Sequence, residues 1–242
     1  MKNLTPYEFS KKLIAYLEKA EEATGREAVI SMGTGHPAAK AELRHESPFI
    51  LNILVASHVR MSPAEFERLV AHKAAYGLLF FVKGYPRWKV PAEFSDFEAF
   101  RINTLGSMLL DTVADIMAHG AGFGVNEEML PALKRLIKAV RQGQDIFRED
   151  MSSEMRILGI VQTAIKSWGL YKYLKGLREK ETARRAMSAI RKTYASEWRL
   201  IEQCQAAVLK NDIFVSEGFA AAFREVLDVF GIAGVELEAH IR

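Results

Sequence analysis

The chain has 242 residues, 49% of them apolar, with only seven Pro and 16 Gly, a composition that excludes a disordered or low-complexity protein and allows a sizeable core. Its one cysteine, Cys204, excludes an intramolecular disulfide framework, and its apolar neighbours predict a buried core thiol in a reducing compartment. The net charge is +3, but it divides into −2 for residues 1–131, +9 for 132–200 and −4 for 201–242. The concentration of charge in the middle region indicates a polyanion-binding surface.

The opening segment, MKNLTPYEFSKK, lacks the apolar stretch of a secretory signal. The apolar runs elsewhere, such as residues 78–82, are too short to span a bilayer. We therefore expect a soluble, intracellular protein with no membrane insertion.

Capping signals predict where the first helices begin. Capping boxes with a proline at the first helical position occur at Thr5–Glu8 and Ser62–Glu65, and Ser95–Glu98 is a box without proline. Apolar residues at helical spacing follow all three boxes, and the third helix is expected to end at the glycines of 120–124.

Further helices are expected at about 126–141, 152–178, 182–209 and 215–230. Only residues 28–31 look like a strand, because two-residue alternation is otherwise almost missing. The predicted fold is all-α and bilobed, with a basic cleft between the lobes. The expected organisation is an N-terminal helix or arm (1–25), an N-lobe (26–122), a C-lobe (123–232) and a C-terminal tail (233–242).

Residues 166–199 hold ten Lys or Arg, three Glu and five Trp or Tyr. A break near residues 179–182 would divide them into two helices. In the second helix an apolar seam at spacings of four, three and four residues is expected to dock on a core, and it consists of Ala183, Met187, Ile190 and Tyr194. Most of the five aromatic residues should belong to the core, with one or two free to face a ligand.

Two basic rows flank this seam and are expected to point outward. They consist of Arg184 with Arg191, and of Arg185 with Lys192. Acidic compensation looks small, since Glu179 and Glu181 lie near the predicted break. The rows are either an ordinary solvated helix face or the binding surface of an external anion.

Other candidate sites are weaker. Residues 33–38 match the dinucleotide pattern G-x-G-x-x-A, but Pro37 interrupts the turn and no second parallel strand is expected, which favours a loop. The six histidines show no paired metal-ligand spacing. Arg101 lies in a mostly apolar helix, and is either a buried arginine paired with a carboxylate such as Asp96 or a phosphate ligand in a groove. Neither a metal nor a cofactor is expected.

Three stretches together resemble the nucleocapsid proteins of segmented negative-strand RNA viruses of the bunyavirus group, in their orthobunyavirus- and phlebovirus-like branches. They are Asp96–Ile102, the basic helix from Leu174 to Tyr194, and Phe223–Ile232, which ends in a Phe-Gly-aliphatic triplet. The resemblance implies a two-lobed helical protein without enzymatic activity that holds single-stranded genomic RNA in a basic cleft. It also implies a homo-oligomer formed by exchange of a terminal arm, presentation of the RNA to the viral polymerase, and a place in the virion and the host cytoplasm.

Carried over by position, Arg101 would line the cleft from the N-lobe, and Arg184, Arg185, Arg191 and Lys192 would line it from the C-lobe. Arg87 and Lys89 form a second small basic-aromatic cluster, expected on the side of Arg101. The other candidate RNA-binding residues are Lys134, Arg135, Lys138, Lys172, Lys175 and Arg178. Such a surface suits phosphate neutralisation without sequence preference.

Two other classes of function stay open. One is a helical protein-interaction or regulatory module whose basic face binds an acidic partner. The other is a helical enzyme that uses His45, His58 or His72, and it depends only on the density of histidines.

Overall fold

The computed structural model describes residues 1–34, 41–44, 50–57, 60–124, 129–145, 147, 152–173 and 177–238. The chain divides into two compact units. The first comprises residues 1–84 and 117–126 with the last three residues, and the second comprises 85–116 and 127–239. Because α3 (Asp96–Gly120) contributes to both units, the predicted boundary at residue 122 differs from this division.

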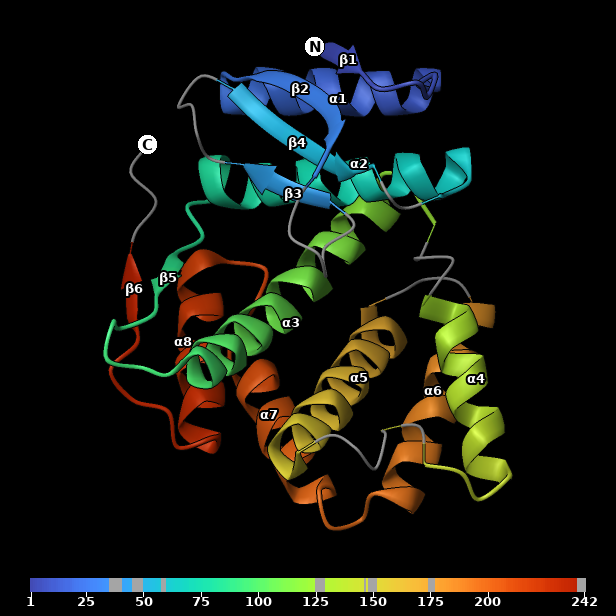
Figure 1. Ribbon diagram of the computed structural model, residues 1–242, viewed down its shortest axis with the longest axis vertical. Coiled ribbons are helices and arrows are strands. Elements are labelled where there is room, and N and C mark those ends of the chain that lie inside the picture. The colour runs from blue at the N-terminus through green and yellow to red at the C-terminus, as the bar shows by residue number, and fades with distance from the viewer. Residues whose placement is uncertain are drawn as a thin grey trace. The chain divides into compact units, whose positions relative to one another are not determined.

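The first unit contains a four-stranded sheet of order β1-β2-β4-β3, from β1 (Lys2–Leu4), β2 (Glu27–Gly33), β3 (Ala41–Arg44) and β4 (Ile50–Ala56) (Figure 1). β2 is parallel to both β1 and β4, whereas β3 is antiparallel to β4. The protein is mostly helical, but the all-α prediction is wrong for this unit. β4 (ILNILVA) was not predicted because six of its seven residues are apolar and residues 53–56 are buried consecutively, so it lacks a clear two-residue alternation.

Two helices, α1 (Lys11–Thr24) and α2 (Pro63–Gly77), pack on one face of this sheet, and a π-helical turn, η1 (Leu78–Val82), follows α2. The register aligns Leu51 with Ala28 and Ile53 with Ile30, so that these buried residues face the helices together. Leu13 and Leu17 of α1 are fully buried in the same core. Residues 11–24 are therefore an integral part of the first unit and do not form a free arm.

Two of the three predicted capping boxes are confirmed. Ser62 and Glu65 bond reciprocally to each other's backbone amides at the start of α2, and Ser95 and Glu98 do the same before α3. The box predicted at Thr5 is wrong, because α1 begins later and the hydroxyl of Ser10 caps it by accepting from the amide of Leu13.

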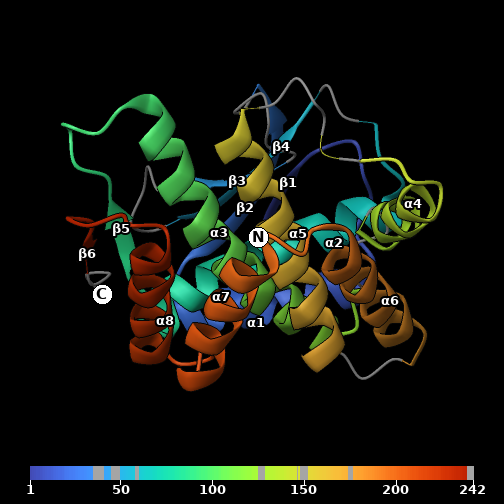
Figure 2. The ribbon, with the colours of Figure 1, turned by 90° about the horizontal axis from the view of Figure 1, so that it is seen from below.

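The second unit is built from α3, α4 (Met129–Arg141), α5 (Ser153–Tyr173), α6 (Leu177–Thr193), α7 (Trp198–Lys210) and α8 (Ser216–Val229). α5 is buried around most of its circumference, and both α6 and α7 pack against it. α4 lies beside α6, and α8 lies beside α7 (Figure 2). The predicted helices 152–178 and 182–209 have the wrong boundaries, since α6 runs unbroken through residues 179–182 and the chain turns at 194–197 instead.

A two-stranded antiparallel ladder of β5 (Arg87–Lys89) and β6 (Glu236–Glu238) completes the second unit. The predicted C-terminal tail is thus paired with the chain's own β5 over residues 236–238. None of the described helices is both long enough and apolar enough to cross a bilayer.

Candidate nucleic-acid interface

One face of α4 is basic and the opposite face is buried. Leu133 and Leu136 pack inward at a spacing of three residues. Lys134, Lys138 and Arg141 follow at spacings of four and three, which places all three on one face of the helix. The short spacing of the apolar residues therefore fixes the direction of the cations.

α6 has the same two-faced character. Ala183, Ile190 and Tyr194 of the predicted seam are buried, Met187 is half-buried, and Ala186 joins them. This burial turns Arg184, Arg185 and Lys192 outward, and the predicted direction of these three side chains is confirmed. The small side chains of Ala183 and Ala186 also allow α6 to pack closely on its neighbours.

The exposed faces of α4 and α6 enclose a groove within the second unit. It consists of a cavity of about 540 Å³ and an adjoining one of about 270 Å³, which share Ile137, Arg141 and Arg185. Apolar groups also line the larger cavity, among them Val140 and Ala189. The cations of the groove are Lys134, Lys138, Arg141, Arg184, Arg185 and Lys192.

Hydroxyl groups complete the lining, from Thr182, Ser188 and Thr193. Among the lining residues that the structure describes, none has a carboxylate and none is aromatic. The groove therefore presents hydrogen-bond donors and positive charge around a narrow aliphatic surface, which suits an anion with several negative groups.

Two of the groove arginines share one carboxylate. Glu181 accepts hydrogen bonds from Nε and Nη2 of Arg184 at 2.8 and 2.9 Å and from Nε of Arg185 at 2.7 Å. The prediction that these arginines have little acidic compensation is wrong, because the unbroken α6 places Glu181 three and four residues before them. Hydrogen bonds from Arg184 and then Arg185 lower the pKa of Glu181 to about 2, so it stays ionised at ordinary pH.

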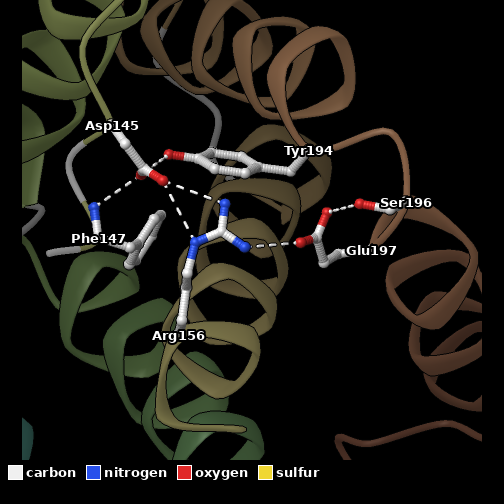
Figure 3. A network of polar contacts seen from close by, with 6 residues as sticks. All are labelled: Asp145, Phe147, Arg156, Tyr194, Ser196 and Glu197. Atoms are coloured by element: carbon white, nitrogen blue, oxygen red, sulfur yellow. Dashed lines mark hydrogen bonds and ion pairs between the residues drawn. The ribbon is translucent and has the colours of Figure 1, made fainter. Parts of the chain in front are cut away.

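A polar network fixes the C-terminal end of α6 to α5 and to the segment after α4 (Figure 3). Arg156 of α5 donates to Oδ2 of Asp145 through Nε and Nη2 at 3.2 and 3.1 Å, and to Oε1 of Glu197 through Nη1 at 2.9 Å. The Tyr194 hydroxyl donates to the same Asp145, and the Ser196 hydroxyl donates to Glu197. Because the three segments meet at Arg156, the network also fixes the two helices that form the groove.

Hydrogen bonding outweighs burial at both carboxylates of this network. Burial alone would raise the pKa of Asp145, but hydrogen bonds from the Tyr194 hydroxyl, the Phe147 amide and Arg156 lower it overall. The pKa of Glu197 is lowered for similar reasons, against burial, by Ser196, by its own amide and by Arg156. Both groups are therefore held in the ionised form.

Arg101, predicted to line the cleft, lies elsewhere. Its Nη2 donates to the carbonyl of Phe230 at 3.2 Å, just beyond the C-terminal end of α8. Its guanidinium lies 5.9 Å from the ring centroids of Phe97 and Phe230. It therefore stabilises the end of α8, and its carbonyl partner differs from the predicted partner, Asp96.

Arg87 and Lys89 also lie outside the groove. They flank Trp88 on β5, opposite Glu238 and Glu236 of β6 in the strand register. Both views of the second unit place this ladder at the end opposite to α4 and α6. The wall that faces α6 is therefore α4, and the predicted pairing of Arg101, Arg87 and Lys89 with the α6 arginines is wrong.

The remaining predicted cations are dispersed. Lys172 lies 5.2 and 5.1 Å from the ring centroids of Trp168 and Tyr173, and Arg191 lies 5.4 Å from that of Trp198. Arg135 is exposed on α4 and lines neither cavity. Lys175 and the side chain of Arg178 lie outside the described residues.

Arg141 is the groove cation that the predicted set omits. It lies three residues after Lys138 and seven after Lys134, so helical periodicity alone places the three together. That spacing is present in the sequence, although α4 lies outside the segment 166–199 in which basic residues are most dense.

The five aromatic residues of 166–199 contribute nothing to the lining of the groove. Trp168 and Tyr194 are buried, and Tyr173 packs edge-on against Phe214. The Trp198 indole donates to Glu202, while Tyr171 is exposed. The expectation that most of them belong to packing is confirmed.

The weaker candidate sites gain no support. Gly33 ends β2, and β2 has a parallel partner in β4, contrary to the prediction that no second parallel strand follows. The next described element after Gly33 is β3 and not a helix, so the dinucleotide pattern gains no support. Residues 35–38 of that pattern lie outside the described part.

Within the described residues no cluster of three His, Cys, Asp or Glu could hold a metal ion. His45 and His58 lie outside those residues, and His72 is buried in α2. Burial raises the pKa of the Cys204 thiol to about 12, which suits a core residue.

Comparison of the chain with protein-family models, with curated proteins and with solved structures finds no match. The resemblance to bunyavirus nucleocapsid proteins therefore stays a prediction from the sequence, and the groove between α4 and α6 is the feature on which a function can be argued.

Proposed function

We propose that the chain binds single-stranded RNA, independently of its sequence, in the groove between α4 and α6. The observation that carries this proposal is the convergence of six cations from two helices on one groove whose described lining has no carboxylate. Three hydroxyl groups add uncharged donors. Phosphate oxygens are the ligands that such a set of arginine, lysine and hydroxyl donors recognises.

The shape of the basic surface supports a chain-like ligand over a single ion. Lys134 and Arg141 are seven residues apart, which is about 10 Å along a helix at 1.5 Å per residue. α6 presents a similar length from Arg184 to Lys192. A row of this length can contact more than one phosphate of a strand, whereas a single phosphate would occupy a small part of it.

The chemistry of the lining also supports binding without sequence preference. Contacts to phosphate fix the position of a strand and carry no sequence information, while sequence is distinguished by contacts to bases. With no aromatic residue in the described lining, base stacking contributes little inside the groove. Affinity should therefore come from phosphate neutralisation and depend strongly on salt.

The wider role in this proposal is that of a viral nucleoprotein, without enzymatic activity, that coats genomic RNA as an oligomer and presents it to a polymerase in the virion and host cytoplasm. This part depends on the resemblance of the three sequence stretches. The pairing of β1 with β2 and of β6 with β5 within one chain does not support exchange of these two segments.

The test is a titration of a mixed-sequence RNA oligonucleotide with the protein at several salt concentrations, in which binding is measured by fluorescence anisotropy. The variant Lys138→Ala/Arg141→Ala should bind all sequences at least tenfold more weakly and lower the salt slope by about two, one for each lost phosphate contact.

The control variant, Lys210→Ala/Arg224→Ala, removes the same charge from exposed positions of α7 and α8 and should bind like the wild type. Equal losses in both variants, or binding by the wild type that does not respond to salt, would contradict the proposal. A wild type that binds an acidic protein through the groove but no RNA would instead identify an interaction module.

A further inference from the structure

Glu181 pairs with two cations of the groove, Arg184 and Arg185, although it is not one of the residues that line the groove. Its carboxylate meets Arg184 through two parallel hydrogen bonds and Arg185 through one, while Glu181 itself lines neither cavity. Arg184 and Arg185 both line the larger cavity, and Arg185 also lines the smaller one. One side chain outside the groove thus occupies the donors of two side chains inside it.

The paired arginine geometry is also the one that a phosphate needs. A guanidinium binds carboxylate and phosphate through the same two-pronged arrangement of donors. The donors that Glu181 occupies, Nε and Nη2 of Arg184 and Nε of Arg185, cannot bond fully to a second anion at the same time. A ligand in the groove and Glu181 therefore draw on the same hydrogen bonds.

Exposure makes this pairing easy to replace. The side chains of Arg184 and Arg185 are 58% and 57% exposed, and that of Glu181 is 42% exposed. Ion pairs at such positions contribute little to stability, because water screens them and two long side chains must be held in place. Replacement of the carboxylate by a phosphate within reach of additional cations is thus favourable.

We infer that Glu181 is an internal competitor of the groove's ligand: it restrains Arg184 and Arg185 in the free protein, gives both up to a phosphate group of the ligand, and so limits the affinity of the groove for polyanions. The inference rests on the proposed function for the class of ligand, a phosphate polyanion. Glu181 is thus a residue that limits the affinity of the groove for this ligand, and its replacement should raise that affinity.

The test compares Glu181→Gln with the matched control Glu225→Gln. The carboxylate of Glu225 is 35% exposed and accepts from Lys210 and from Asn211, but it lies on α8 and lines neither cavity of the groove. Both variants gain one unit of positive charge. Binding of inorganic tripolyphosphate is measured by calorimetry, and binding of the mixed-sequence RNA by anisotropy, at the same salt concentration.

Glu181→Gln should bind tripolyphosphate about fivefold more tightly than the wild type, the factor that corresponds to one weak ion pair. Glu225→Gln should change affinity less than twofold. Circular dichroism of both variants checks that α6 stays folded, and Glu181→Ala should repeat the result.

The outcomes separate the two proposals. Tripolyphosphate affinity equal to that of Glu225→Gln would overturn the inference, and weaker binding would overturn it as well by showing that Glu181 orients the arginines for the ligand. The RNA measurement reports on the proposed function alone. Tighter tripolyphosphate binding by Glu181→Gln with no RNA binding by any variant would retain the inference and reject RNA as the ligand.

Discussion

The second unit has two regions in which basic residues gather, and the partners of these residues differ between the two. At the β5–β6 ladder, Arg87 and Lys89 stand opposite Glu238 and Glu236, and nearby Arg101 donates to a carbonyl at the end of α8. Between α4 and α6, six cations line one groove, and Glu181 is the carboxylate that holds two of them.

The difference lies in which charges the tertiary structure brings opposite each other. The acidic C-terminal segment folds back onto β5, so the cations of this strand face glutamates across the ladder. α4 and α6 instead bring basic face to basic face. Mutual repulsion between the helices must be offset by the packing beneath them and by the network at Arg156, which leaves the groove able to gain from an external anion.

The largest effect should come from reversing one charge in each region. Arg141→Glu should weaken RNA binding by roughly 30-fold, or about 2 kcal/mol, since it removes a hydrogen bond to a charged group and adds repulsion. Lys89→Glu, also an exposed position, should change the affinity less than twofold. RNA anisotropy at one salt concentration checks both, and similar losses would mean that net charge rather than the groove drives binding.

The next effect tests the support beneath the groove. Arg156→Ala should lower the free energy of unfolding by about 2–3 kcal/mol, because it leaves two ionised carboxylates without their shared partner. The value is below that of a fully buried pair, since Arg156 and Asp145 are each 32% exposed, although Glu197 is only 11% exposed. Chemical denaturation measures it. Arg156→Lys keeps the charge but loses the two-pronged geometry and should be intermediate.

A pH series should show part of the same stabilisation. The pKa values of Asp145 and Glu197 are lowered in the folded protein. Their contribution is therefore complete above the ordinary carboxyl pKa of about 4 and is lost as the pH falls below it. Denaturation at pH 7, 4 and 3 should show a smaller acid-induced loss in Arg156→Ala than in the wild type. Parallel losses would assign the acid sensitivity to other carboxylates.

The smallest effect separates Arg101 from the groove. Arg101→Ala should lower the free energy of unfolding by about 1 kcal/mol, the usual contribution of one hydrogen bond, as the Phe230 carbonyl loses its donor. RNA affinity and its salt slope should stay at the wild-type values. A lower slope would return Arg101 to the binding surface and contradict its assignment as a stabiliser of α8.

Much of the helical fold could be predicted from local signals. The capping boxes at Ser62 and Ser95 place two helix starts correctly, and the apolar seam of α6 has the predicted direction. The turn between α6 and α7 was not predictable in the same way, because helical periodicity continues through it. At this turn Glu197 accepts from Arg156 and Tyr194 donates to Asp145, contacts that depend on the tertiary structure.

The directions of the basic side chains in the candidate site could likewise be predicted from the sequence. The α6 cations follow from the direction of the seam, and the basic face of α4 follows from its spacing. Their meeting in one groove did not follow, nor did the location of Arg101, Arg87 and Lys89 elsewhere, since contacts between segments far apart in the sequence leave no trace in local periodicity.

The sequence by itself determined most of the helical segments though not all of their ends, the outward direction of the basic residues on α4 and α6, and the concentration of charge in residues 132–200, because each depends on spacing along a single helix or on composition. Only the tertiary structure decided the sheet of the first unit, the partners of Arg101, Arg87 and Lys89, and the meeting of α4 with α6 in one groove. Residues 53–56 of β4 are buried consecutively, so this strand shows no clear alternation. The partner available to a cation depends on which distant segment packs beside it: a carbonyl for Arg101, and the glutamates of β6 opposite Arg87 and Lys89. Arg184 and Arg185 pair with Glu181 of their own helix, and the tertiary structure adds the basic face of α4 opposite them.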